Sequence, residues 1–438
     1  MNLLPALSLL TSIPTLAPQE SRERWTQEGL ERVSAQILEE VERMRGQEFA
    51  RPVKVELADK ETFLQHATER IEKLMTPELV AGNEMAARLL GLIPPDMDLM
   101  ETSLDVLKEQ VGGFYSPGTD TFYLMDSFTG PVAKIILAHE LTHALDDQLF
   151  DIDSTFMETL DNTDASFAYG AVVEGSGTSL MSQWQREHLG SDIDLEDLAE
   201  VGDMGADVLM RTPPYIWMPL LASYTRGASF LVRSDSMLTG QVKTASTEDV
   251  TRAFEEPPLS SEQVLHPEKY WDPEQRDDPR VIEFEASDLP RGFEVLYEDT
   301  LGEIHLSLVT RLDPLATPQS LAAIQLAPAT NELAQGWGGD RLVVAGSDEA
   351  RYMRLVTLWD TERDAAEFYG AMTMRLPSLE ESVARVAELE LGEGARARAA
   401  VELAYGESPD SVVLTLHFGL RRSQVRALSE GLVHRERK

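Results

Sequence analysis

The chain of 438 residues contains no cysteine. Without a thiol it cannot form a disulfide, a thiolate zinc site, an iron–sulfur site or a cysteine nucleophile. Any zinc site must therefore be built from His, Asp and Glu side chains. The absence of cysteine is compatible with both oxidising and reducing compartments.

Basic residues are scarce as well: 38 Lys and Arg stand against 76 Asp and Glu, a net charge of -38. A surface this acidic repels phosphate backbones and anionic headgroups, so we expect neither a nucleic acid nor an anionic membrane as a partner. A solvated acidic surface suited to a salty or extracellular medium explains the charge. Attraction of cationic substrates is the alternative interpretation.

Long hydrophobic runs are missing too. Residues 3–16 are apolar but too few to span a bilayer, and we expect no integral membrane segment. They are similar to the core of a secretory signal, with Thr15 and Ala17 near a possible cut, which predicts a secreted or periplasmic protein. No Lys or Arg precedes them and Pro18 would follow the cut, so a core-packing segment in a cytoplasmic protein is the alternative.

Composition divides the chain into three parts. An apolar share of 42% with 26% charged residues is that of a folded protein, and 438 residues are too many for one compact core. Residues 1–50 hold the signal-like segment and a helix, and residues 51–275 form the main domain. Beyond the Pro-rich and charged linker WDPEQRDDPR, residues 280–438 are expected to form a separate α+β domain.

Hydrophobic periodicity predicts the elements of each part. Helices are expected at 20–45, 60–75, 77–90, 101–110, 131–149, 165–189, 361–375 and 379–389. Strands are expected at 53–59, in a hairpin at 112–126, in the runs VIEFEA, IHLSLVT, RLVVAG and YMRLVTLWD, and at 411–418.

The motif HELTH, at residues 139–143, carries the chemistry of the chain. Positions four apart lie on one face of a helix, so His139 and His143 can bind one metal ion through their imidazole nitrogens. Glu140 lies beside His139 and would act as the general base on a water molecule at that metal. The apolar run AKIILA before the motif places it in a buried helix. Two histidines without a metal are the alternative.

A third ligand is expected from the helix at 165–189. Glu174 lies there among apolar and small residues, where an unpaired carboxylate would be costly to bury. Gly170, Gly175 and Gly177 would let this helix approach the first one closely. We therefore predict that Glu174 binds the metal, with a buried salt bridge as the alternative. Zinc held by two imidazoles and one carboxylate keeps a coordination position open for water.

HELTHALDDQ followed by VEG resembles the active site of the gluzincins, the thermolysin-like and aminopeptidase-like branch of HExxH peptidases. GFYSPGTDTFYL, AHELTHALDDQ, VVEGSGT, YTRGASF, SSEQVLHPEKY and GWGGDR, in this order, resemble a bacterial family of largely uncharacterised gluzincin-type proteins over residues 50–375. The resemblance implies a zincin-like, two-lobed α+β metallopeptidase domain followed by a small α+β domain. It also implies a Zn2+ cofactor and a peptide or protein substrate.

The pattern departs from thermolysin behind the ligands. The interval between His143 and Glu174 is longer, and Thr178 stands where thermolysin-like enzymes place an aspartate. Asp147, four residues beyond His143 on the same helix face, is the predicted substitute that orients an imidazole.

A further donor is expected to stabilise the oxyanion. In gluzincins a His or Tyr of the second lobe does this, and the candidates are His266, Tyr224 and Tyr270. His266 precedes Pro267 in a polar loop and is the first choice, ahead of Tyr224. Loop packing and core packing are the alternatives.

The sequence thus predicts zinc-dependent hydrolysis of peptide bonds. The hairpin at 112–126 resembles the zincin edge strand that pairs with extended substrates, or it is simply structural. An inactive zincin-fold binding or scaffold protein and a metal-dependent hydrolase of non-peptide amides are the rival functions. GWGGDR suggests no chemistry, because tight turns explain its glycines.

Overall fold

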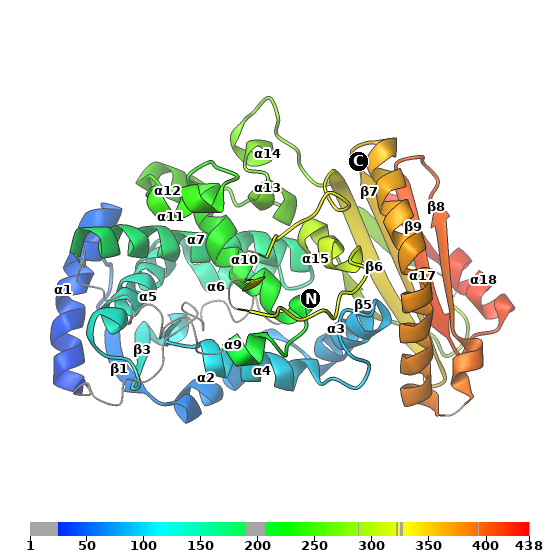
Figure 1. The fold of residues 1–438 in the computed structure, drawn as a ribbon, viewed down its shortest axis with the longest axis horizontal. Helices are drawn as coiled ribbons and strands as arrows, with labels where there is room; N and C mark the ends of the chain where they lie inside the picture. The colour runs from blue at the N-terminus through cyan, green and yellow to red at the C-terminus, as the bar shows by residue number, and fades with distance from the viewer. Residues whose placement is uncertain are drawn as a thin grey trace.

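The computed structural model describes residues 25–188, 206–287, 289–320, 323–324, 327–392 and 394–437. These residues form a mixed α+β fold, as predicted, in which a mainly helical part lies beside a five-stranded sheet (Figure 1). The signal-like segment at 3–16 lies outside the described residues. Among the described helices, none is both long enough and apolar enough to cross a membrane.

The N-terminal helices begin where the sequence supplies a capping side chain. Thr26, Asp59, Thr76 and Asp98 each accept a hydrogen bond from the backbone N–H three residues on. The four helices that they cap are α1 (Gln27–Arg45), α2 (Lys60–Leu74), α3 (Pro77–Leu89) and α4 (Leu99–Gln110). All four were predicted, although α1 begins later than expected.

A three-stranded sheet packs against α1 and against the HELTH helix, α5 (Gly130–Phe150), and α1 also packs directly on α5. Its order is β1-β3-β2, with β1 (Lys54–Ala58) parallel to β3 (Thr121–Met125) and β2 (Gly113–Ser116) antiparallel to β3. The predicted hairpin at 112–126 is confirmed, with the 3₁₀ turn η2 (Pro117–Thr119) between its strands. Strand β2 is therefore an edge strand, and it packs against α5.

Three long helices form the centre of the helical part: α5, α7 (Thr163–His188) and α10 (Pro214–Leu231). Helices α7 and α10 touch backbone to backbone, because a Cβ added to Gly227 would lie 1.9 Å from the carbonyl oxygen of Ala171. A Cβ on Gly175 would lie 2.3 Å from the carbonyl carbon of Gly227. The glycines thus set the distance between these two helices, so Gly175 faces α10 and not α5, the helix that it was expected to approach.

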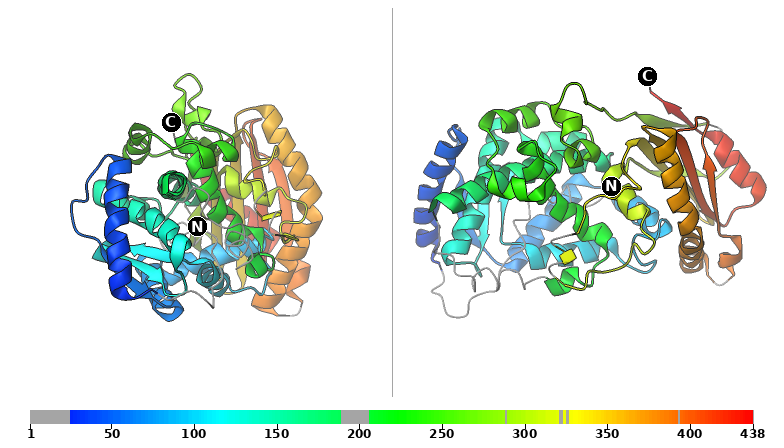
Figure 2. Two further views of the ribbon diagram at one scale, coloured as in Figure 1. Left: turned by 60° about the vertical axis from the view of Figure 1, so that its left-hand side comes forward. Right: turned by 45° about the horizontal axis from the view of Figure 1, so that its top comes forward.

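Shorter helices surround this centre. They are α6 (Ile152–Glu158), α9 (Ala206–Leu209), α11 (Met237–Val242), α12 (Thr247–Glu255), α13 (Ser261–Leu265) and α14 (Glu268–Trp271). Helix α1 stands at one end of the molecule and the five-stranded sheet at the other, which both views of Figure 2 show.

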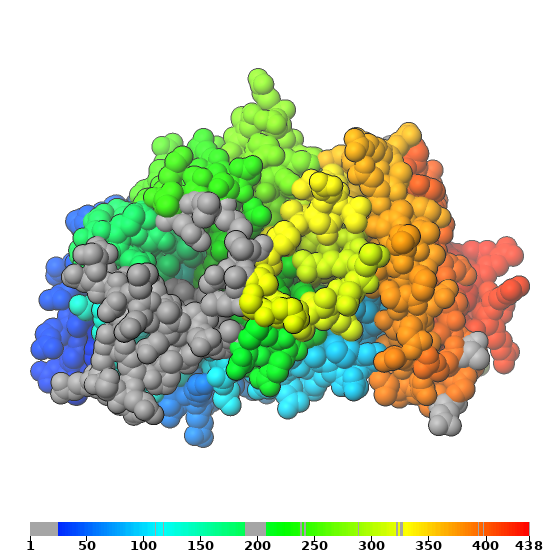
Figure 3. All heavy atoms as spheres, viewed as in Figure 1, coloured from blue at the N-terminus to red at the C-terminus, as the bar shows by residue number. Residues whose placement is uncertain are grey.

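The five-stranded sheet is antiparallel with the order β5-β6-β7-β9-β8. Its strands are β5 (Glu294–Asp299), β6 (Trp337–Ser347), β7 (Ala350–Trp359), β9 (Ser411–Phe418) and β8 (Ala400–Tyr405). Helix α17 (Glu362–Leu391) packs on the sheet, followed by the 3₁₀ turn η3 (Ala395–Arg398). The ribbon of β4 (Ile282–Ala286) and β10 (Leu432–Glu436) and helix α18 (Arg422–Gly431) complete the chain. On the face shown in Figure 3, the yellow segment after residue 310 lies between the green helices and α17.

Two predicted elements are wrong. The run IHLSLVT is helix α15 (Gly302–Val309), not a strand. All eight of its residues are buried, so the helix has no solvent-exposed face. The alternation of polar and apolar residues therefore does not indicate a half-buried strand here. The helices expected at 361–375 and 379–389 are one helix, α17, which continues through Pro377. Apolar residues on both sides of the proline, such as Met372 and Leu379, are buried and hold the helix together.

The helical part and the sheet share a core. One hydrophobic cluster extends from Leu30 to Phe418 and includes residues on both sides of the predicted linker. Asn83 of α3 donates hydrogen bonds to the hydroxyl groups of Tyr215 and Tyr297. The fully buried Arg375 guanidinium of α17 donates to the carbonyl oxygens of Val309, Arg311 and Leu90.

Candidate metal centre

Helix α5 brings the two histidines of HELTH together. Pro131 lies in its first turn, where a missing N–H costs no hydrogen bond. Every residue from Ile136 to Asp147 is buried, so the motif lies in the interior. The Nε2 atoms of His139 and His143 are 2.8 Å apart, and their rings are perpendicular.

Glu174 reaches the same point from α7. Its Oε2 lies 3.2 Å from Nε2 of His139 and 3.5 Å from Nε2 of His143. One ligand atom from each of the three residues lies within 4.8 Å of the other two, and all three residues are fully buried. The structure therefore brings together the three predicted ligands, and they could hold a metal ion.

Gly177 makes this approach possible. A Cβ at this position would lie 2.7 Å from Cε1 of His139 and 2.9 Å from Cε1 of His143. The glycine follows Glu174 by one helical turn, so it faces the imidazoles from the same side of α7. Its role is to make room for the ligands rather than to bind.

The pKa values of the two histidines favour the protonation state that binds a cation. Burial lowers the pKa of both histidines, that of His143 to about 4, so their nitrogen lone pairs are available at neutral pH. Burial raises the pKa of Glu174 to about 7, and hydrogen bonds from His139 and Tyr224 oppose that rise. Two neutral imidazoles and one carboxylate are a donor set that zinc accepts.

Glu140 lies on α5 beside His139 and is fully buried. Adjacent helical residues point in directions about 100° apart, so its carboxylate does not share the histidine face. This is the relation expected of a base that assists without being a ligand.

Tyr224 of α10 lies at the centre. Its ring is stacked near that of His139, with 5.8 Å between the centroids, and its hydroxyl is hydrogen-bonded to Glu174. Helix α10 holds it there through the close glycine contact with α7, three residues further on.

His266 is placed differently. Its Nε2 lies 3.0 Å from Oε1 of the buried Glu303, a contact that raises the pKa of the imidazole against the effect of burial. Among the described residues, no hydrogen bond or ion pair joins it to His139, His143 or Glu174. The structure thus brings Tyr224 to the ligands and gives His266 another partner, contrary to the order of preference from sequence.

Tyr270 also has another partner. Its hydroxyl donates to the carbonyl oxygen of Glu256, and its ring packs on Phe230 and Trp271. The core-packing alternative holds for this residue.

The prediction for Asp147 is wrong. Its carboxylate accepts from the Tyr115 hydroxyl at 3.2 Å and from the backbone N–H of Ile152 at 3.2 Å, instead of orienting an imidazole. The neighbouring Asp146 is the carboxylate whose charge acts on His143, where it raises the pKa against burial. Positions three and four beyond His143 both lie near its helix face, so spacing alone could not distinguish the two.

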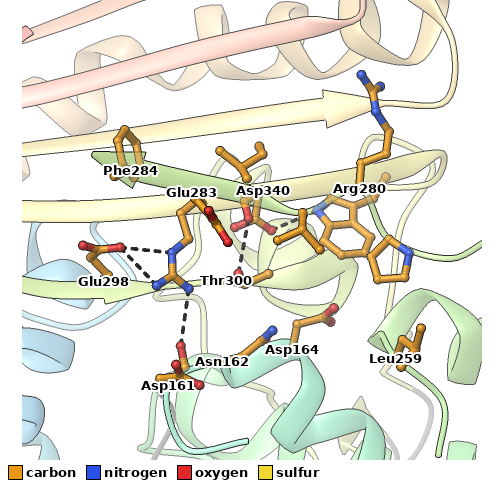
Figure 4. A pocket seen from close by; sticks show the side chains of 15 residues that line it. Asp161, Asn162, Asp164, Leu259, Arg280, Glu283, Phe284, Glu298, Thr300 and Asp340 are labelled. Atoms are coloured by element: carbon orange, nitrogen blue, oxygen red, sulfur yellow. Dashed lines mark hydrogen bonds and ion pairs between the residues drawn. The ribbon is translucent and has the colours of Figure 1, made fainter. Parts of the chain in front are cut away.

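A cavity of about 360 Å³ lies apart from this centre, between the N-terminus of α7 and strands β4, β5 and β6 (Figure 4). None of the predicted site residues lines it. Residues of the GWGGDR motif line the cavity. One of them, the buried Asp340, accepts hydrogen bonds from the backbone N–H groups of Leu301 and Gly302 and so fixes the start of α15. Arg341 pairs with Glu298 at 3.1 Å. Asp340 and Arg341 of the motif thus make structural contacts.

A second cluster of possible metal ligands consists of three carboxylates, those of Glu262, Asp277 and Asp360. These carboxylates already surround a side-chain cation. The Lys269 ammonium lies 2.7–2.8 Å from an oxygen of each of the three. This cluster is a lysine-centred ion network that ties the helical part to the sheet.

Comparison with known proteins gives one match. Residues 293–416 match a family described as a domain of unknown function (DUF8575). The match covers most of the five-stranded sheet and α17, but none of the residues of the metal centre. No curated protein and no solved structure matches the chain. What the chain is similar to is therefore a domain without an assigned activity.

Proposed function

We propose that the protein is a zinc-dependent metallopeptidase of the gluzincin type. The observation that carries the proposal is the convergence of His139, His143 and Glu174 from two helices at one buried point. The resemblance of HELTHALDDQ and VEG to the gluzincin motifs supports zinc and peptide hydrolysis specifically.

In this proposal each residue has one role. His139, His143 and Glu174 hold the zinc ion, which when bound supplies a Lewis acid that polarises a carbonyl and acidifies water. Glu140 takes the proton of the attacking water and passes it to the leaving amine. Tyr224 donates a hydrogen bond to the negative charge that develops on the carbonyl oxygen.

The sheet beside α5 offers an edge strand for a peptide substrate, although residues 113–115 of that strand are buried. Strand β2 is an edge strand of the β1-β3-β2 sheet and packs against the helix that carries HELTH. An extended peptide that adds to such an edge is held by main-chain hydrogen bonds, which would align its scissile bond along α5.

Complete burial favours a second candidate. His139, Glu140, His143 and Glu174 are all fully buried, and Tyr224 is 8% exposed. An enclosed site of this kind suits a small substrate, so a metal-dependent hydrolase of non-peptide amides is the alternative. The presence of Glu140 argues against the third possibility, an inactive zincin-fold binding protein.

The test combines metal analysis with cleavage assays. We expect one zinc ion per chain in the wild type, and its loss in the His139→Ala/His143→Ala variant. Glu140→Gln should retain zinc but lose cleavage of a peptide library. Stoichiometric zinc in the double histidine variant would disprove the metal centre. Cleavage of small amides without cleavage of any peptide would select the second candidate.

A further inference from the structure

Arg45 is the last residue of α1, almost one hundred positions before HELTH, yet its side chain ends beside the metal helix. Gly46 closes α1 in the left-handed conformation, and the Arg45 side chain is 4% exposed. Its Nε donates to Oδ1 of Asp146 at 3.0 Å, and its Nη2 lies 2.8 Å from the same oxygen. Asp146 is fully buried.

The second oxygen of the same carboxylate reaches α7. Oδ2 of Asp146 accepts a hydrogen bond from the Ser176 hydroxyl. Arg45, Asp146 and Ser176, which we call the Arg45 bridge, thus connect α1, α5 and α7 through one carboxylate. Each of the two carboxylate oxygens has its own partner, so the bridge fixes Asp146 in one orientation.

The bridge meets both helices where they carry the metal ligands. Asp146 follows His143 by three residues, less than one turn of α5. Ser176 lies between Glu174 and Gly177, the residue against which both imidazoles pack. A displacement of α7 along α5 would therefore break the bridge and move Glu174 away from the histidines at the same time.

We propose that Arg45 is a positioning residue of the metal centre: through Asp146 and Ser176 it fixes α7 against α5 so that Glu174 and the two histidines reach one ion. This inference rests on the proposed function for the identity of the ligands. Arg45 is suited to the task because a buried carboxylate without a cation is strongly disfavoured. Helix α1 is then a working part of the centre, although the sequence placed it outside the main domain.

A neighbouring arginine supplies a matched control. Arg43 also lies on α1 and also pairs with α7, through Glu187 at 2.8 Å, but this pair is exposed. Arg43→Met removes an ion pair between the same two helices without touching Asp146. Arg45→Met and Ser176→Ala remove the two ends of the bridge separately.

The experiment measures zinc affinity by competition with a chromophoric chelator, on the full chain, with circular dichroism to confirm folding. Loss of a side chain that orients metal ligands typically weakens metal binding about 10- to 100-fold. We expect that loss for Arg45→Met and for Ser176→Ala, and wild-type affinity for Arg43→Met. Arg45→Lys should recover part of the loss, because it restores the charge but not the two-nitrogen contact.

A double variant separates positioning from stability. Arg45→Met/Asp146→Leu replaces the buried pair by apolar groups of similar size, which is often neutral for folding. If it regains thermal stability but still binds zinc weakly, the bridge positions ligands. If affinity returns together with stability, or if Ser176→Ala and a folded Arg45→Met bind zinc like the wild type, the inference is wrong. Glu174→Ala distinguishes this failure from that of the proposed function: undiminished zinc affinity in that variant overturns the ligand set itself.

Discussion

At the scale of single residues, the convergence of the three candidate metal ligands could be predicted from sequence because helical spacing leaves little freedom. Two histidines four apart must share a face, and an isolated glutamate in an apolar helix needs a partner. The carboxylate that interacts with these candidate ligands could not be predicted. Asp146 and Asp147 are adjacent and equally plausible from spacing, and only the positions of Arg45, Ser176 and Tyr115 decide between them.

The partners of His266 and Tyr224 could not be predicted from sequence for a similar reason. A polar loop with a histidine before a proline gives no information about which carboxylate the imidazole meets. Glu303, which contacts His266, immediately precedes the run that was predicted as a strand and lies in the first turn of helix α15. The wrong assignment of that run left the position of the Glu303 carboxylate unpredicted.

Tyr224→Phe tests the predicted role of the hydroxyl. Because the hydrogen bond to the oxyanion strengthens only in the transition state, we expect kcat to fall about 100- to 1000-fold with little change in KM. Steady-state kinetics on the best peptide substrate give both constants. Tyr270→Phe, which removes a hydroxyl bonded to the Glu256 carbonyl, should leave kcat unchanged. A fall in zinc content in Tyr224→Phe, with normal turnover per bound zinc, would show instead that the hydroxyl only orients Glu174.

At the scale of elements, most helices and strands were predictable where their caps and periodicity are local. The exceptions are α15, whose residues are all buried, and α17, which continues through a proline. In both helices, packing against distant segments overrides the local sequence pattern. Such packing cannot be read from the local sequence.

The contact between α7 and α10 gives a prediction at this scale. Gly227→Ala would place a methyl group 1.9 Å from the Ala171 carbonyl oxygen, so the helices must separate. We expect the free energy of unfolding to fall by about 1–3 kcal/mol, measured by urea denaturation.

Gly370→Ala is the control for helix propensity. Gly370 is exposed on α17 and an added Cβ there meets no atom within 4 Å. This variant should gain about 0.5–1 kcal/mol, because alanine favours the helix over glycine. Equal effects of the two substitutions would show that the close contact does not determine the helix spacing.

At the scale of the whole molecule, buried acids at the junction of helices and sheet predict a dependence of stability on pH. Burial raises the pKa of Asp164 to about 8, helped by the charges of Asp340 and Glu303. The folded state therefore holds a proton that the unfolded state has lost above pH ~4. This contribution to stability is complete below pH ~4 and is lost as the pH rises to about 8.

Asp164→Asn removes that titration. The free energy of unfolding of the wild type should fall relative to the variant by up to about 1.4 kcal/mol per pH unit between pH 5 and 8. Urea denaturation at each pH measures the difference. Asp59→Asn serves as the comparison, because hydrogen bonds from the backbone and side chain of Thr62 lower the pKa of that exposed carboxyl. Its difference from the wild type should stay constant over this range. Parallel profiles for Asp164→Asn and wild type would contradict the assignment.

The shared hydrophobic cluster predicts how the protein unfolds. Since it extends from Leu30 to Phe418, we expect one cooperative transition in differential scanning calorimetry of the full chain. Two separated transitions, one for each side of residues 275–280, would show that the parts fold independently. A truncated chain that ends at residue 275 should lack fixed tertiary structure in its near-ultraviolet circular dichroism.

The buried side chain of Arg375 joins the helical part of the chain to the part that contains the five-stranded sheet. One buried guanidinium binds carbonyl oxygens of two segments, Leu90 in the helical part and Val309 and Arg311 at the end of α15, and backbone atoms offer the same acceptors whatever their side chains. These hydrogen bonds can therefore form even when the side chains of the acceptor residues change, but the full set requires both parts of the chain. A cut at the Pro-rich segment before β4 would separate Arg375 from the Leu90 carbonyl and leave it with those of Val309 and Arg311. A fragment that carries only one of the two parts is therefore expected to expose the apolar surface that the other part covers.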